Sequence, residues 1–408
     1  MSHSRDPLVT EVTEVVDNGN CSGCGVCAGL FPGIEMTLSA DGFMRPDLSE
    51  RRNAVPREDE CRVFNRVCPG KRVTAPPADQ GTRHHEVFGR YVQVWEGWAV
   101  DPEVRRAGSS GGVLTAISSY LSMKKRAPAR VVAMDSANPS RSVPIQIMSR
   151  AEALNAAGSR YAPVSVGAGP LDELSSITGK PCEVSAIRAT RNDLPAGPVL
   201  LSFFCAGTPS QKATDELVGQ LGHSIENLTS SKYRGDGWPG QFVVESSDGS
   251  SNAMSYEDSW GAVLGKQLQD RCKICVDGTG ESADVAVGDY WASDQAGYPL
   301  FADADGRSVV IARTPRGLRL VEECVDAGIL EVRPILLDDV AKIQPLQVKR
   351  RRSLPGRLLG RILVGRSVPR YPGYKLARTF FSNLGLNLRA VGGTVRRNVR
   401  AGTVNRSR

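Results

Sequence analysis

The chain has 408 residues, with 51 Lys and Arg against 44 Asp and Glu, a formal net charge of +7 and ten cysteines. This length allows two or three domains, and the apolar and charged fractions are those of an ordinary soluble globular protein. The first 20 residues are polar, with one expected short strand over 9–16, and lack the apolar run of a signal peptide. No window approaches about 18 uninterrupted apolar residues, which excludes a membrane-spanning helix. We therefore expect a cytoplasmic protein whose closely spaced cysteines are metal ligands or redox groups rather than disulfides.

The first group of cysteines resembles a ferredoxin motif with one member missing. Cys21, Cys24 and Cys27 keep the spacing of the bacterial run C-x2-C-x2-C-x3-C-P, and its proline is present at Pro32. Phe31 stands where the fourth cysteine belongs. Three thiolates leave one iron of a cluster without a protein ligand, so a fourth ligand is expected elsewhere in the chain.

A second Cys-Pro step provides that candidate. Cys68 precedes Pro69, a step that turns the chain away from a cluster as in ferredoxins, and Cys61 is the alternative ligand seven residues earlier. A zinc knuckle and unbound thiols are the competing interpretations, although C-x2-C-x2-C is a poor zinc spacing.

The main domain follows a Pro/Gly-containing linker over residues 73–86. Residues 91–100 alternate apolar and polar side chains and predict a strand. A Gly/Ser turn then opens a helix expected over 113–123, and free backbone N–H groups at such a helix start suit a pyrophosphate. An ordinary N-cap turn is the alternative, because the GxGxxG spacing and the Walker lysine are absent. The turn residues are Gly108, Ser109, Ser110, Gly111 and Gly112.

Alternating strands and helices predict a mostly parallel sheet, in which ligands bind at the carboxyl ends of the strands. Cys205 ends a buried strand expected over 198–204, and a helix is expected over 209–221. Cys182 precedes another helix in the same manner, so the two cysteines can converge on one centre. The alternative is that both are small buried core residues. Further elements are expected as strands at 131–133, 145–148, 242–245, 308–312 and 330–333 and as helices at 151–157, 183–190, 256–269 and 316–327.

A Cys-x-x-Cys pair, Cys272 and Cys275, supplies two thiolates, whereas a tetrahedral iron or zinc site needs four ligands. Carboxylates and glycines crowd the loop over 277–291 directly afterwards, which indicates a site loop facing the substrate, with a solvated acidic loop as the alternative. Cys324 lies within an expected helix and is interpreted as a packing residue.

Positive charge is concentrated at the C-terminus, where sixteen Lys or Arg and no Asp or Glu follow from Lys349 onward. One helical face there is expected to be apolar, with Arg357, Arg361 and Arg366 nearby; its residues are Leu354, Leu358, Leu359, Ile362 and Leu363. Basic amphipathic helices lie on anionic membranes, dock on an acidic body or partner protein, or bind nucleic acid non-specifically. Disorder is the remaining alternative, and nucleic acid is not expected because no recognised module accompanies the tail.

Taken together, these residues resemble the beta-subunit family of coenzyme F420 hydrogenases and dehydrogenases, which includes a plant 7-hydroxymethyl chlorophyll a reductase. The resemblance spans roughly residues 20–340 and leaves the basic tail unmatched. The pieces that carry it are Gly108 to Thr115, Gly158 to Tyr161, Gly179 to Cys182, Phe204 and Cys205, Tyr233 to Gly240, and Arg271 to Cys275 continuing through Asp284 to Asp289.

The resemblance implies an FAD and iron–sulfur oxidoreductase with two 4Fe–4S clusters. Its main-domain cluster would use Cys182, Cys205, Cys272 and Cys275, and the N-terminal cluster Cys21, Cys24, Cys27 and Cys68. FAD would lie on the turn from Gly108 to Gly112 and near the remaining expected contacts, which are Thr115, Ser159, Arg160, Tyr161 and Lys180. The implied electron partners are a ferredoxin-like donor or coenzyme F420. No catalytic acid is assigned, since Asp289, Glu281 and Lys180 are candidates by position only.

The expected architecture is α/β, with four parts. A ferredoxin-like iron–sulfur region covers residues 1–72, a linker 73–86, an FAD and 4Fe–4S binding domain with a mostly parallel sheet 87–345, and a basic amphipathic helical tail 346–408. Two other functions compete with the enzyme. One is a non-catalytic electron-transfer or scaffold subunit that docks to a partner or a membrane surface, in a context such as polysaccharide biosynthesis. The other is a zinc-stabilised interaction protein.

Overall fold

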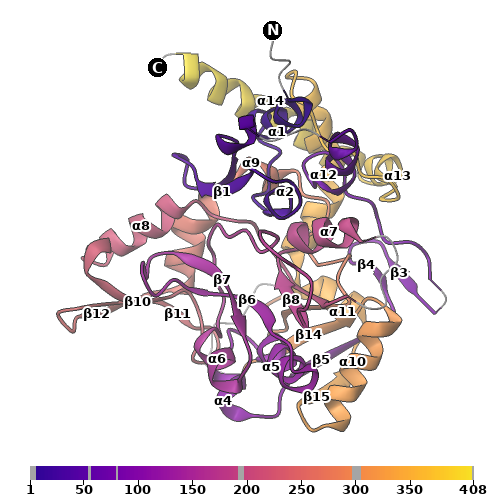
Figure 1. The fold of residues 1–408 in the computed structure, drawn as a ribbon. Coiled ribbons are helices and arrows are strands. Elements are labelled where there is room, and N and C mark those ends of the chain that lie inside the picture. Colours follow the sequence, from indigo (N-terminus) through magenta and orange to yellow (C-terminus); the bar gives the residue numbers. More distant parts are fainter. Residues whose placement is uncertain (1–5, 54–56, 80, 192–196, 296–304, 407–408) are drawn as a thin grey trace.

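The structure is a computed structural model that describes residues 6–53, 57–79, 81–191, 197–295 and 305–406. Its centre is an eight-stranded sheet in the order β15-β5-β14-β13-β9-β8-β6-β7 (Figure 1). Its strands are β5 (Gln93–Ala99), β6 (Ala129–Met134), β7 (Ser142–Ile147), β8 (Ser176–Gly179), β9 (Val199–Phe203), β13 (Val285–Asp289), β14 (Ser308–Ala312) and β15 (Leu330–Pro334).

The sheet is mixed, and its parallel part is central. Strands β13, β9, β8 and β6 run parallel to one another, whereas β14, β5, β15 and β7 each pair antiparallel with their neighbours. The parallel arrangement expected from the sequence is therefore present in four consecutive strands, β13, β9, β8 and β6. Parallel neighbours need crossovers, and α7 (Pro181–Thr190) supplies the one between β8 and β9.

Helices cover both faces of this sheet, because successive side chains of its buried strands point to opposite sides. In β14, Val310 and Ala312 join a core with α5 (Val113–Lys125) and α10 (Pro315–Asp326). Val309 and Ile311 face the other side, toward α11 (Leu337–Ile343). The strands and helices expected around 91–100, 198–204, 308–312, 113–123, 209–221 and 316–327 are confirmed within a few residues.

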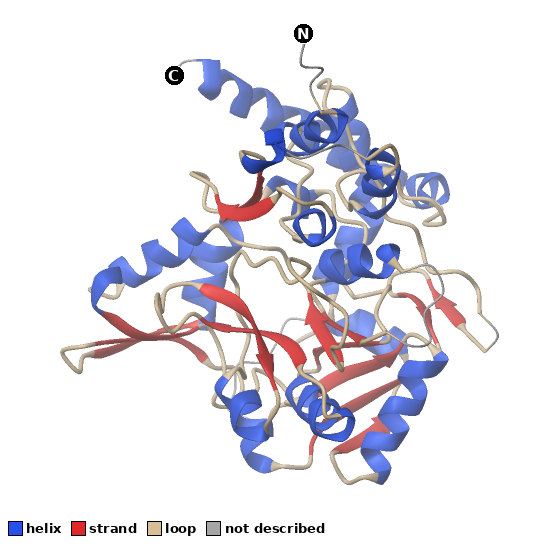
Figure 2. Ribbon diagram, viewed as in Figure 1, coloured by secondary structure: helices blue, strands red, loops and turns tan. Residues whose placement is uncertain are grey.

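The remaining elements build smaller units on this centre, including a three-stranded sheet β10-β11-β12 to one side (Figure 2). Further strands are β1 (Glu35–Leu38), β2 (Met44–Asp47), β3 (Arg83–His85), β4 (Gly89–Tyr91), β10 (Leu228–Lys232), β11 (Gln241–Ser246) and β12 (Ser251–Ser255). Further helices are α2 (Val26–Leu30), η1 (Glu50–Asn53), α3 (Glu60–Val67), α4 (Pro102–Ala107), α6 (Arg150–Asn155), α8 (Gln211–Gln220), η2 (Ile225–Asn227) and α9 (Asp270–Lys273).

One secondary-structure expectation is wrong, and another is confirmed only in part. The short strand expected over 9–16 is part of helix α1 (Pro7–Asp17), because Asp6 caps the first turn and Leu8, Val12 and Val15 bury one helical face. The helix expected over 256–269 is present over 257–266, where it consists of a π-helix, η3 (Glu257–Val263), and a short 3-10 helix, η4 (Leu264–Lys266).

The C-terminal segment is helical and packs beside the N-terminal segment. Figure 1 shows α12 (Pro345–Ile362), α13 (Leu376–Ser382) and α14 (Leu384–Arg406) gathered with α1 at one end of the molecule. Asn20 donates its side-chain amide to the Ser367 carbonyl at 3.1 Å, and Arg361 donates to the Asn18 carbonyl. Among the described helices, none is both long enough and apolar enough to cross a membrane.

Candidate cofactor site

Four cysteines from three parts of the chain line one small cavity. Cys182 lies in the first turn of α7, and Cys205 follows the carboxyl end of β9. Cys272 lies in the short helix α9, and Cys275 follows it. The structure therefore brings together the two cysteines at the sheet edge and the Cys-x-x-Cys pair.

The surroundings of these thiols suit a negatively charged cluster of thiolate ligands. Burial raises the pKa of Cys205 to about 12, with neighbouring Cys272 adding to the rise. The guanidinium groups of Arg271 and Arg350 line the same cavity, and the Thr208 backbone N–H donates to the Cys272 sulfur at 3.3 Å. Such donors and cations offset the cost of buried thiolates.

A buried polar atom without a protein partner also lies at this cavity. The Ser22 hydroxyl is buried and has no hydrogen-bond partner, and Ser22 lines the cysteine cavity. A hydroxyl in that position can donate to a ligand that fills the space. In the described part of the chain, no group of three or more His, Cys, Asp or Glu is arranged to hold a single metal ion.

The N-terminal cysteines form a second group around the core of α1 and α3. Burial raises the pKa of Cys27, and the next contributions come from Cys24, Cys21 and Cys68, so these four thiols are electrostatic neighbours. The pKa of Cys61 is also raised by burial, but its charged neighbours are carboxylates and one arginine and include no other cysteine. Cys68 is therefore a neighbour of the ferredoxin-like run, and Cys61 and Cys68 both pack against the same core around α1 and α3.

Phe31, which replaces the fourth cysteine of that run, is a core residue. Its side chain is 4% exposed and its ring centroid lies 6.4 Å from that of Phe64. At the position of the fourth cysteine, the ferredoxin-like run therefore has an apolar side chain, which packs α2 against α3.

Two side chains connect the N-terminal cysteines with the main cavity. Arg271 donates to the Pro69 carbonyl at 3.0 Å, directly after Cys68. Gln269 donates to the Ser22 carbonyl at 3.2 Å, directly after Cys21. The two cysteine groups are therefore held side by side through the residues that flank Cys272.

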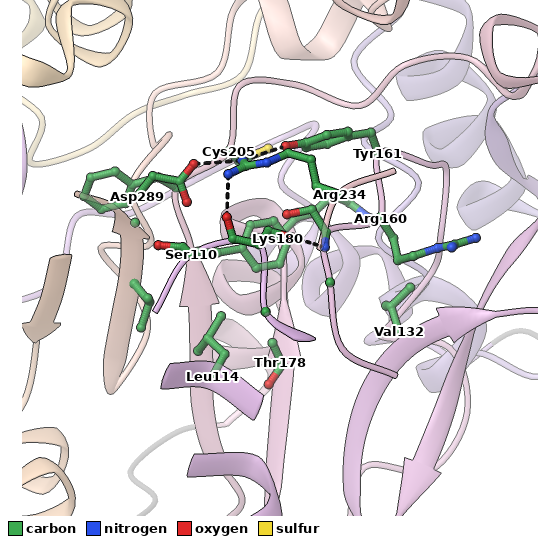
Figure 3. Close-up of a pocket in the computed structure, with 18 of the residues that line it drawn as sticks. Ser110, Leu114, Val132, Arg160, Tyr161, Thr178, Lys180, Cys205, Arg234 and Asp289 are labelled. Carbon is green, nitrogen blue, oxygen red and sulfur yellow. Dashed lines mark hydrogen bonds and ion pairs between the residues drawn. The ribbon is translucent and has the colours of Figure 1, made fainter. Parts of the chain in front are cut away.

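A larger cavity of about 440 Å³ lies at the carboxyl ends of the parallel strands, a volume typical of small-molecule and cofactor sites (Figure 3). It contains nine of the ten residues expected to bind FAD. Gly111 is the exception: its backbone N–H donates to the Ser308 hydroxyl at 2.9 Å, and a Cβ there would lie 2.6 Å from the Gly97 carbonyl oxygen. The lining members are Gly108, Ser109, Ser110, Gly112, Thr115, Ser159, Arg160, Tyr161 and Lys180.

Glycine is required where the expected turn enters α5. Gly112 has a φ of +71°, and a Cβ there would lie 2.5 Å from the Val104 carbonyl oxygen. The turn consequently presents backbone to the cavity at the start of a 13-residue helix. This arrangement keeps the positive end of the helix dipole facing the cavity.

Arg234 is a cavity residue that the sequence analysis did not select. Figure 3 shows it between Asp289 and Tyr161, with nitrogen to oxygen distances of 2.9 Å to Asp289 and 3.3 Å to Tyr161. Its side chain is only 3% exposed. Arg234 lies within the sequence motif from Tyr233 to Gly240, which pointed to this segment. Its contact with Asp289, 55 positions further along the chain, forms only when the chain folds.

Lys180 is also fixed by its neighbours. Its ammonium group donates to the Val164 carbonyl at 3.0 Å and to Glu183 at 2.7 Å, and the Glu183 carboxylate is almost fully buried. Burial lowers the pKa of Lys180, but the Glu183 carboxylate, together with the neighbouring Cys182 and Cys205, raises the pKa above its usual value. The cavity therefore has a fixed cation at the end of β8.

The two cavities share a wall. Cys205, Gly207 and Thr208 line both the cysteine cavity and the larger cavity. A redox group in one cavity would thus be separated from a group in the other by a single stretch of chain.

The acidic loop after Cys275 divides into two parts. Asp277 accepts the backbone N–H groups of Thr279, Gly280 and Glu281 at 2.8–2.9 Å, and Glu281 pairs with Arg351 at 3.0 Å. These carboxylates are buried, so the alternative of a solvated acidic loop is wrong for this part. At the other end, the segment from Val287 to Asp289, together with Trp291, lines the large cavity. Among the candidate acids, Glu281 therefore lies outside that cavity and Asp289 inside it.

The basic tail completes the cysteine cavity. Arg350 in α12 donates to the Cys205 carbonyl at 2.7 Å and also to the Ala206 carbonyl. Tyr371 donates to the Ile274 carbonyl at 2.6 Å, between the paired cysteines. Cys324 is buried in the core beneath α10, as expected for a packing residue.

These features define an α/β protein with a cysteine-lined site and an adjoining cofactor-sized site. Two family models match consecutive segments of the chain. The model for the N-terminal part of the coenzyme F420 hydrogenase/dehydrogenase beta subunit matches residues 94–168, and the model for its C-terminal part matches residues 173–336. The chain belongs to this family.

Similar proteins agree with that assignment. The beta subunit of coenzyme F420 hydrogenase from Methanococcus voltae is 27% identical over 300 residues, which are 69% of this chain and 99% of that protein. A coenzyme F420-dependent sulfite reductase from Methanocaldococcus jannaschii is 24% identical over 363 residues, 83% of this chain and 51% of that protein. A chain of the F420-reducing [NiFe] hydrogenase complex from Methanosarcina barkeri shares the fold, with a TM-score of 0.51, 21% identity and coverage of 71% of this chain and 98% of that one.

Proposed function

We propose that the protein is an iron–sulfur flavoprotein oxidoreductase that relays electrons between a one-electron donor and FAD. The observation that carries the proposal is the shared wall, in which Cys205, Gly207 and Thr208 border both cavities. A wall of one chain segment suits electron transfer between two bound groups. Membership in a family whose relatives are named for coenzyme F420 reactions supports the same class of chemistry.

The chain offers ligands for two 4Fe–4S clusters. Cys182, Cys205, Cys272 and Cys275 would hold the first, and Cys21, Cys24, Cys27 and Cys68 the second. The order of sites is then N-terminal cluster, main cluster and flavin cavity, since Arg271 and Gln269 connect the two cysteine groups.

The large cavity would hold FAD. The turn from Gly108 to Gly112 would face the pyrophosphate, and the fixed cation of Lys180 and the buried Arg234 would face polar parts of the cofactor. When bound, FAD exchanges electrons singly with iron–sulfur clusters and in pairs, as hydride, with organic substrates. Coenzyme F420 or a small organic molecule would be the hydride partner, and a ferredoxin-like protein the one-electron partner.

This chain's residues would contribute burial, orientation and charge. The Arg234 and Asp289 pair fixes one end of the cavity, and Arg271 and Arg350 place positive charge beside the four thiols. No residue is assigned as a catalytic acid, because Asp289 is paired and Lys180 is bound to Glu183.

The test is iron, sulfide and flavin analysis of the protein purified without oxygen. We expect about eight irons and one flavin per chain, following from two four-iron clusters. Cys205→Ser should remove about half of the iron, whereas Cys324→Ser, a buried cysteine outside both cavities, should leave the iron unchanged. A colourless protein that contains zinc would refute the proposal. Anaerobic mixing with reduced ferredoxin and with reduced coenzyme F420 then identifies the donor that reduces the protein.

A non-catalytic electron-transfer subunit is the second candidate. The relatives from Methanococcus voltae and Methanosarcina barkeri are named as subunits, which favours a partner protein for this chain as well. Iron without flavin in the purified protein would favour this function over the enzyme.

A further inference from the structure

Helix α14 packs against the protein with its polar face. Asn387 is fully buried; its side chain accepts the Gly356 backbone N–H at 2.7 Å and donates to the Arg352 carbonyl at 3.0 Å. Thr394, two turns further along, is 5% exposed and lies against Gly360, where a Cβ would come within 2.8 Å of it. The contact between α12 and α14 is therefore made by small and polar residues.

The apolar residues of α14 lie elsewhere on the helix. Leu384 and Leu388 are one turn apart and 47% and 58% exposed. Val391 and Val395 continue the same stripe at helical spacing and are partly exposed. The buried face of α14 is therefore polar and its apolar stripe lies beside that face, whereas an ordinary surface helix buries its apolar stripe.

The neighbouring helices add exposed apolar side chains of the same kind. Ile362 and Leu363, at the end of α12, are 53% and 63% exposed, and Phe381 in α13 is 74% exposed. We call Ile362, Leu363, Phe381, Leu384 and Leu388 the apolar tail surface. Large apolar side chains are thus exposed on three helices that contact one another, and exposed apolar side chains concentrated in one part of a protein are a feature of interaction sites.

The charge around this surface is positive. No Asp or Glu occurs in the sequence after Asp339. Some tail arginines are used inside the protein, such as Arg350 and Arg351, but Arg389 and Arg396 on α14 are exposed. A partner that covers α14 must therefore accept its apolar side chains and supply negative charge to the exposed arginines of the same helix.

We propose that α12, α13 and α14 dock on the surface of an anionic lipid bilayer. A bilayer interface combines acyl chains with anionic headgroups, so it matches both the leucine stripe and the arginines. Helix α14, at 23 residues, would lie in the interface plane without crossing it. The proposal does not depend on the cofactors, because the apolar tail surface does not line either cavity.

The test is sedimentation of the full-length protein with vesicles of phosphatidylcholine alone and with added phosphatidylglycerol. We expect binding only to the anionic vesicles, and weaker binding at high salt. The double variant Leu384→Ser/Leu388→Ser should lose roughly tenfold or more in partitioning, since lipid contact of two leucines is removed. Arg389→Gln should lose about fivefold. The control is Met123→Ser, which removes an apolar side chain that is 50% exposed on α5, outside the tail.

Phe381→Ser serves as a second variant, and unchanged circular dichroism shows that each variant is folded. Absence of wild-type binding to anionic vesicles would overturn the proposal. So would unchanged binding of both the leucine and the phenylalanine variants. Dimerisation in solution that these substitutions abolish would instead assign the surface to a second copy of the chain, and would equally overturn the lipid assignment.

Discussion

The buried pair of Arg351 and Glu281 allows a direct test of whether the basic tail is part of the folded body. The two side chains lie 3.0 Å apart and are 9% and 4% exposed. Arg351 also donates to the Val276 carbonyl at 2.8 Å. Arg351→Met removes one partner of a buried ion pair, which typically destabilises a protein by about 3–5 kcal/mol.

The adjacent residue provides a matched control. Arg352 pairs with Glu86, but those side chains are 43% and 68% exposed. An exposed pair is screened by solvent, so Arg352→Met should change the free energy of unfolding by about 0–1 kcal/mol. Both substitutions remove one positive charge from the same helix, so the difference between them measures the buried contacts of Arg351, which are the pair with Glu281 and the hydrogen bond to Val276.

The destabilisation should also depend on pH. Burial raises the pKa of Glu281 above its usual value, and Arg351 opposes that shift. A carboxyl whose folded pKa exceeds its unfolded pKa favours folding when protonated, and this contribution is lost as the pH rises through the folded pKa. The loss caused by Arg351→Met should therefore grow as the pH increases.

Urea unfolding followed by tryptophan fluorescence measures both variants, and equal m-values show that the same surface unfolds. The double variant Arg351→Met/Glu281→Leu should recover most of the lost stability, because no unpaired charge remains buried. Equal effects of Arg351→Met and Arg352→Met would refute the reasoning, as would a double variant no more stable than Arg351→Met alone.

Three further outcomes are expected. Cys68→Ser should remove about half of the iron, whereas Cys61→Ser should keep it, as measured by iron and sulfide analysis; the reverse result would exchange their roles. Arg234→Gln should weaken flavin binding by roughly tenfold or more, since a charged hydrogen-bond donor is lost; fluorescence titration with FAD measures this, and unchanged affinity would contradict the cavity assignment. Burial raises the pKa of Cys324 to about 12, so the thiol should resist alkylation at pH 8 until urea unfolds the chain; rapid labelling of the folded protein would contradict its burial.

The local sequence pattern was enough to predict strands that are buried on both faces. The strand expected over 308–312 agrees with β14 because it is apolar on both faces. The strand predicted over 9–16 is wrong because valine and threonine, which favour strands, are frequent there, whereas the buried Leu8, Val12 and Val15 recur at helical spacing. Asp6 as the N-cap residue and the proline in the first turn are signals of a helix start.

Long-range contacts limited what could be predicted of the site. The cysteines were found because their chemistry is specific and because carboxyl ends of parallel strands share an edge. Arg234 and Arg350 were not found, because arginine is common on surfaces and only the folded chain brings them to Asp289 and to the Cys205 carbonyl. The same holds for Gly111, whose turn was predicted while its contact with Ser308 was not.

The tail arginines divide into two groups, and this division decides how the tail can be tested. Arg350 and Arg361 donate to backbone carbonyls of the body and the N-terminal segment. Arg389 and Arg396 project from α14. Removing the tail at Lys349 would delete both groups at once, opening the cysteine cavity while abolishing any lipid contact. A loss of vesicle binding in such a truncation would then have two explanations. Point substitutions on the exposed face of α14 separate them, because they leave the contacts of α12 with Cys205 intact.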